Sequence, residues 1–146
     1  KASGDTADAR EAYADLIARL GSAKANLDPS LLAIGSSFRE RYGEAYLQYA
    51  DLLLSDAKGA DAARKSALLA QVRDLTEFTK TAEAADYFRD PCIGAGLQAR
   101  VVEAADKSAI TLYPIALEDR LELLAGRGDR LELVTIAVTR KESSKR

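Results

Sequence analysis

The residues of this chain that could carry out covalent catalysis are few, and Cys92 is the first of them. A catalytic cysteine needs a base, usually a histidine, that holds the thiolate and moves the proton. The chain contains one cysteine and no histidine. We therefore interpret Cys92 as a small buried apolar residue, with redox modification as the alternative. The same composition excludes the ordinary zinc sites.

Pairs of carboxylates are the second kind of candidate. Glu118 and Asp119 are adjacent in a predicted turn, and Asp86 and Asp90 are spaced to share a helical face. Neither pair has a partner motif that would tune one acid against the other for general acid–base work. Glu83, Asp86 and Asp90 could together offer oxygens to a divalent cation, but they lack the spacing of a calcium-binding loop. We expect no catalytic residue, no metal and no cofactor in this chain.

The charge balance bears on the kind of partner. The 146 residues include 21 basic and 23 acidic side chains, for a net charge of −2. Nucleic-acid binding needs a clustered basic surface, and the only basic run is the tail at residues 140–146. We interpret that tail as a solvated terminus or a cut end, with a nucleic-acid or membrane tether as the alternative. We expect no nucleic-acid partner.

Cysteine usage and hydropathy predict the compartment. A single cysteine excludes an internal disulfide framework and fits a reducing compartment, so we expect a cytoplasmic protein. No apolar run approaches the roughly 20 residues of a spanning helix, and the polar start lacks a signal-peptide core. We expect no membrane association. The chain also lacks methionine, which indicates a piece of a longer product.

Helices are predicted up to about residue 105. Ser37 and Glu40 form a capping-box pattern at the start of one long helix, and Asp61 is a good N-cap for the next, which we expect to run from Ala62 to about Phe88. The short loop between them predicts an antiparallel hairpin. Shorter helices are expected near residues 29–34 and 94–105. The apolar positions of the first helix and of the long pair are Tyr13, Leu16, Ile17, Leu20; Phe38, Tyr42, Ala45, Tyr46, Tyr49, Leu53; Leu68, Leu69, Val72, Leu75, Phe78, Thr79 and Ala82.

The tyrosines at helical spacing allow two interpretations. They could form a stacking surface for bases or sugars, but aromatic residues at this spacing are usually core, and we expect core.

Strands are predicted from about residue 106 onward. Three β-branched or alternating segments, Ala109–Leu117, Arg120–Leu124 and Leu131–Val138, are separated by short turns. Consecutive strands should therefore pair as an antiparallel meander. Pro114 has no backbone N–H to donate to a neighbouring strand, so we expect its part of the first strand to lie at a sheet edge or at a bulge.

Alternation also predicts how the leucines of two strands are arranged. Leu121 and Leu123 should share one face, with Glu122 opposite. Leu131 and Leu133 repeat that arrangement around their own glutamate.

The segment Asp86–Ile93 joins the two halves. Pro91 cannot continue a helix and pushes the preceding residue toward extended geometry, so the long helix should end just before it. We expect a structural joint built from Tyr87, Phe88, Pro91 and Cys92, with Leu112, Tyr113 and Leu121–Leu124 joining the helices to the strands. The fold class is then α+β: a helical region over residues 1–105 and a meander over residues 106–146.

A family resemblance accompanies these motifs. Tyr13–Ile17 recurs as Tyr49–Leu53, close to the period of about 34 residues of tetratricopeptide repeats, although the full repeat pattern is missing. The joint Asp86–Ile93, followed by Ile110–Ile115 and Asp119–Leu124, resembles the segment that precedes and begins the CHAT domain of bacterial tetratricopeptide-CHAT proteins. The resemblance covers roughly residues 38–138.

That resemblance implies a caspase-like cysteine protease fold, whose parallel sheet with flanking helices carries a histidine and a cysteine beyond Arg146. Cys92 matches a cysteine ahead of the domain, not the nucleophile. It implies that this chain is a noncatalytic linker that couples degenerate helical repeats to the protease sheet. Its partners would be the remainder of that domain and a protein bound by the helices.

An alternative of another class stays open. The chain could be a stand-alone helical interaction module that dimerises through a strand edge or through the tyrosine-rich helix.

Overall fold

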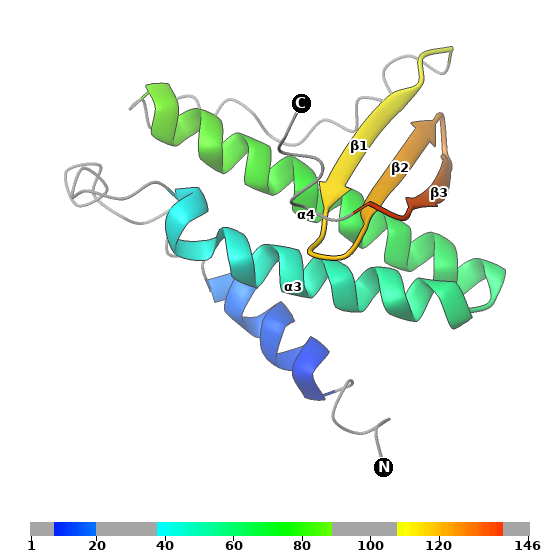
Figure 1. Ribbon diagram of the computed structural model, residues 1–146, viewed down its shortest axis with the longest axis horizontal. Helices are drawn as coiled ribbons and strands as arrows, with labels where there is room; N and C mark the ends of the chain where they lie inside the picture. The colour runs from blue at the N-terminus through cyan, green and yellow to red at the C-terminus, as the bar shows by residue number, and fades with distance from the viewer. Residues whose placement is uncertain (1–7, 20–37, 89–107, 139–146) are drawn as a thin grey trace. The chain divides into compact units, whose positions relative to one another are not determined.

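The computed structural model describes residues 8–19, 38–88 and 108–138 and shows an α+β fold (Figure 1). A helix spans residues 8–19. The long helices are α3 (Phe38–Gly59) and α4 (Ala62–Phe88), and the strands are β1 (Thr111–Ala116), β2 (Leu121–Arg127) and β3 (Arg130–Ile136). The predicted order, helices followed by a short antiparallel meander, is confirmed.

The connection between α3 and α4 is two residues long, and Asp61 ends it as an N-cap. Its Oδ1 accepts a hydrogen bond from the Arg64 backbone N–H at 2.9 Å, and its carbonyl accepts one from the Lys65 N–H at 2.8 Å. These bonds satisfy donors that the first turn of a helix otherwise leaves unpaired. The predicted start of α4 is confirmed, and so is its end at Phe88.

Several sequence-based predictions lie outside the described residues. They are the Ser37 cap, the helices near residues 29–34 and 94–105, Pro91 and Cys92 of the joint, and the basic tail. The predicted boundary at residues 105/106 also falls there.

The chain folds into two compact units, and both long helices contribute to each. Unit 1 comprises Lys1–Leu52 and Glu77–Gln98, and unit 2 comprises Leu53–Thr76 and Ala99–Arg146. Each unit has its own buried apolar residues.

Unit 1 buries aromatic rings. Tyr46 is buried and stacks on Phe78 with ring centroids 5.7 Å apart, and Tyr13 stacks on Tyr49 at 6.2 Å. Burial raises the pKa of Tyr46 to about 12. Tyr13 also donates a hydrogen bond to the Gln48 side chain. The expectation that the tyrosine stripe is core is confirmed at Tyr46.

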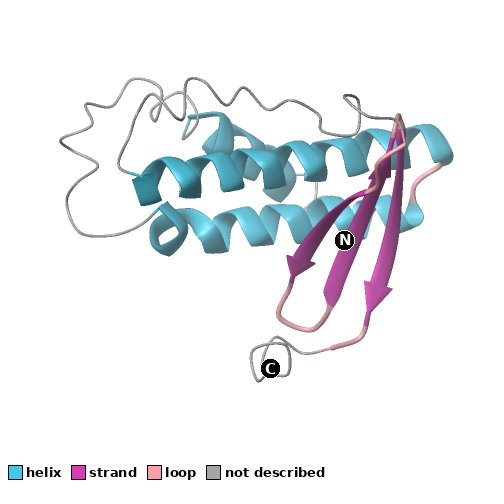
Figure 2. Cartoon of the chain, turned by 90° about the horizontal axis from the view of Figure 1, so that it is seen from above, coloured by secondary structure: helices cyan, strands magenta, loops and turns pink. Residues whose placement is uncertain are grey.

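Unit 2 contains the sheet, in the order β1-β2-β3 with both pairs antiparallel (Figure 2). Residues paired across an antiparallel ladder share a face, so the register defines two faces. The inner face, mostly buried, consists of Thr111, Tyr113, Ile115, Glu122, Leu124, Gly126, Leu131, Leu133 and Thr135. The outer face consists of Leu112, Pro114, Ala116, Leu121, Leu123, Ala125, Arg127, Arg130, Glu132, Val134 and Ile136.

The turn between β2 and β3 determines that register. Gly128 has φ = 57°, a conformation that two-residue hairpin turns need and that L side chains disfavour. Leu121 therefore pairs with Ile136, and Leu131 pairs with Gly126. The predicted alternation is confirmed, but the two leucine pairs, Leu121/Leu123 and Leu131/Leu133, lie on opposite faces.

Candidate functional site

The residues predicted to form the joint are distributed over both units. Tyr87 and Phe88 lie at the end of α4, where the Tyr87 side chain is exposed. Tyr113 is fully buried on the inner face, whereas Leu112 is exposed on the outer face. The structure thus brings Leu112 and Tyr113 together only as neighbours in one strand, with their side chains on opposite faces.

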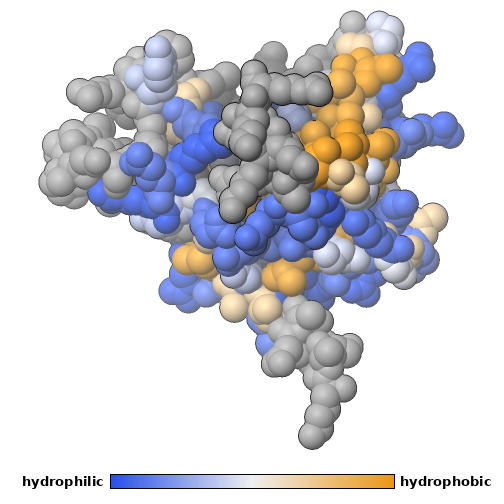
Figure 3. Space-filling view, viewed as in Figure 1, coloured by the Kyte–Doolittle hydropathy of each residue, from blue (hydrophilic) through white to orange (hydrophobic). Residues whose placement is uncertain are grey.

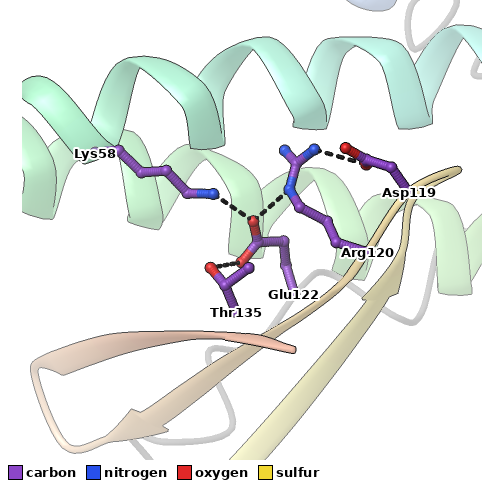
Figure 4. A network of polar contacts seen from close by, with 5 residues as sticks. All are labelled: Lys58, Asp119, Arg120, Glu122 and Thr135. Carbon is purple, nitrogen blue, oxygen red and sulfur yellow. Dashed lines mark hydrogen bonds and ion pairs between the residues drawn. The ribbon is translucent and has the colours of Figure 1, made fainter. Parts of the chain in front are cut away.

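A cluster of charged side chains around Glu122 lies within unit 2 (Figure 4). Oε1 of Glu122 accepts hydrogen bonds from Lys58 Nζ at 2.9 Å and Arg120 Nε at 2.7 Å. Oε2 accepts one from Thr135 Oγ1 at 2.6 Å. Arg120 Nη1 also binds Asp119 Oδ1 at 2.8 Å. We call these five residues the Glu122 cluster.

Three elements position the cluster. Lys58 belongs to the last turn of α3, and Thr135 is the ladder partner of Glu122 on β3. Arg120 immediately precedes β2, where its carbonyl accepts a hydrogen bond from the Leu117 N–H at 2.9 Å and closes the β1–β2 turn. Because residues two apart in an extended strand share a face, Arg120 reaches the Glu122 carboxylate. The carboxylate therefore connects β2 to α3 and to β3.

The Glu122 side chain is 0% exposed, the sole buried charged residue among those the structure describes. Burial by itself raises the pKa of Glu122. Hydrogen bonds from Thr135, Lys58 and Arg120, together with the Lys58 charge, outweigh burial and lower the pKa below its usual 4.5. Glu122 is therefore ionised at neutral pH.

This arrangement does not suit Glu122 to acid–base catalysis. Both carboxylate oxygens already accept hydrogen bonds, and no solvent reaches the group. A general base must be able to reach the proton that it takes and needs a pKa near the working pH. Burying a carboxylate is expensive unless charged and polar donors surround it, as they do here. The Glu122 cluster is a structural network of ion pairs and hydrogen bonds that holds α3, β2 and β3 together; we call this network the clamp.

Sequence reasoning did not identify the clamp. The alternation Leu121-Glu122-Leu123 suggests that the leucines face the core and the glutamate faces water, since charged residues are rarely buried. The signal that could have indicated otherwise is Leu124, which shares a face with Glu122 and is fully buried. Neither the pairing with Thr135 nor the bond to Lys58 follows from local sequence.

The outer face of the sheet is a second candidate, because it is apolar and partly exposed. Leu112 and Val134 are 53% and 51% exposed, and Ile136 is exposed as well. Figure 3 shows hydrophobic side chains gathered over the strands of unit 2. A surface of this kind marks a binding site more often than a catalytic one.

The charged side chains of the outer face gather at the β2–β3 hairpin. Arg127 and Arg130 are directly opposite each other in the ladder, and both are exposed. Glu132 lies two residues further along β3 on the same face. No ion pair of these two arginines occurs within the described residues.

No group of acidic, histidine or cysteine side chains that could hold a metal ion occurs in the part of the chain that the structure describes. Among the helices at 8–19, α3 and α4, none is long and apolar enough to cross a membrane. No protein-family model matches the chain, and neither a curated protein nor a solved structure matches it.

Proposed function

We propose that this chain is a noncatalytic docking module whose outer face is covered by another protein surface. The observation that carries the proposal is the exposure of Leu112, Val134 and Ile136 on one face of a sheet whose other face is already buried. Strands buried on both faces in their final assembly are apolar at nearly every position. The run Ile110–Leu117 has that composition.

The finer form of the proposal follows from the resemblance to tetratricopeptide-CHAT proteins. In that form the chain is the linker of a CHAT-type cysteine protease and couples helical repeats to the protease sheet. The Glu122 cluster supports it, because the bond of Lys58 to Glu122 ties the end of a helix to the central strand at 2.9 Å. A force on α3 would act directly on β2.

Cysteine labelling tests the docking proposal. Val134→Cys, in a background where Cys92 is serine, places one thiol on the outer face. We expect the thiol to react quickly in the isolated chain and at least about tenfold more slowly in protein made from the full natural coding sequence, since labelling tracks the accessible population. Lys65→Cys, exposed on α4 in the same unit, is the matched control and should react alike in both proteins. Equal rates for Val134→Cys in the two proteins would overturn the proposal.

The full coding sequence also tests the finer form. A histidine and then a cysteine at strand ends downstream of Arg146 would support a CHAT-type protease. Their absence, with the outer face still protected, would leave the docking module without the protease.

A second candidate function is homodimerisation, and β3 favours it. Within the described sheet β3 pairs only with β2, so its other edge presents backbone groups that a second copy could pair. The tyrosine-rich helix favours dimerisation less, because Tyr46 already stacks on Phe78 and Tyr49 on Tyr13 within unit 1. Sedimentation at rising concentration should then show twice the 15.7 kDa chain mass.

A further inference from the structure

We draw no further inference here: the strongest candidate, the apolar outer face of the three-stranded sheet, on which Leu112, Val134 and Ile136 are exposed, carries nothing beyond the docking function, because nothing in the part of the chain that the structure describes shows what covers it.

Discussion

Glu122 is the residue whose removal should reveal most about the stability of unit 2. It is an anion without contact to water, and it holds the positions of Lys58, Arg120 and Thr135. Replacing Glu122 leaves Lys58 and Arg120 without their buried counter-charge, which usually destabilises more than the intact pair stabilises.

Glu122→Gln should lower the free energy of unfolding by about 2 kcal/mol. This is less than the roughly 3–5 kcal/mol for a fully buried pair, because Lys58 is 45% exposed and can turn toward water. Urea denaturation measures the change. Asp119→Asn, on a carboxylate that is 73% exposed, is the control and should change stability by less than about 1 kcal/mol. Equal effects of the two substitutions would show that the clamp is not the stabilising interaction.

The lowered pKa of Glu122 predicts a dependence of stability on acid. A carboxylate whose pKa is lower in the folded state binds fewer protons there than in the unfolded chain, so stability rises with pH in that range. The contribution of Glu122 is complete above its unfolded pKa of about 4.5 and is lost as the pH falls through the folded value.

Urea midpoints measured from pH 6 to pH 3 should therefore converge for the wild type and Glu122→Gln at the acid end. Other carboxylates titrate in the same range, but they affect both proteins alike. A difference between the proteins that stays constant down to pH 3 would contradict the lowered pKa.

The start of α4 depends on one side chain, that of Asp61. Asp61→Ala removes the acceptor for the Arg64 N–H and should lower the free energy of unfolding by about 1 kcal/mol. Asp61→Asn keeps an oxygen acceptor and should retain most of the stability. Thermal unfolding of the three proteins measures both effects. An alanine variant as stable as the asparagine one would show that the cap does not contribute.

The sequence predicted the elements better than it predicted their faces. The cap at Asp61, the end of α4 before Pro91 and the meander all follow from local chemistry, because capping, proline geometry and alternation act within a few residues. The buried carboxylate could not be predicted in this way. Alternation shows that Glu122 and Leu123 lie on different faces, but it cannot tell which face is covered when both contain leucine.

Predicting the outer face would also have required the register of the strands. Arg127 faces Arg130 only because the turn at Gly128 pairs these positions. A shift of one residue would move every side chain of β3 to the other face. The outer face and its charged end are thus properties of the sheet and not of any single strand.

For the molecule as a whole, the outer face should matter for solubility more than for stability. Leu112→Thr with Val134→Thr keeps strand propensity at β-branched threonine and should change the free energy of unfolding by no more than about 0.5 kcal/mol per site. The double variant should bind less of an apolar fluorescent dye and remain soluble at higher ammonium sulfate concentrations.

Tyr113→Thr, on the buried inner face, is the contrasting variant and should unfold the protein at a markedly lower urea concentration. If the double variant were destabilised as much as this one, the outer face would already be covered within the chain.

Pro114 makes the two edges of the described sheet unequal as sites for adding a further strand. A proline has no N–H to donate, and β1 lies at one side of the three strands described. A strand that approached β1 from outside would find a gap in the ladder of donors, whereas the far side of β3 has no proline between Arg130 and Ile136. Sheets from neighbouring molecules should therefore add at β3 and stop at β1. Assembly in a crowded solution would then end at pairs of sheets rather than continue into fibres.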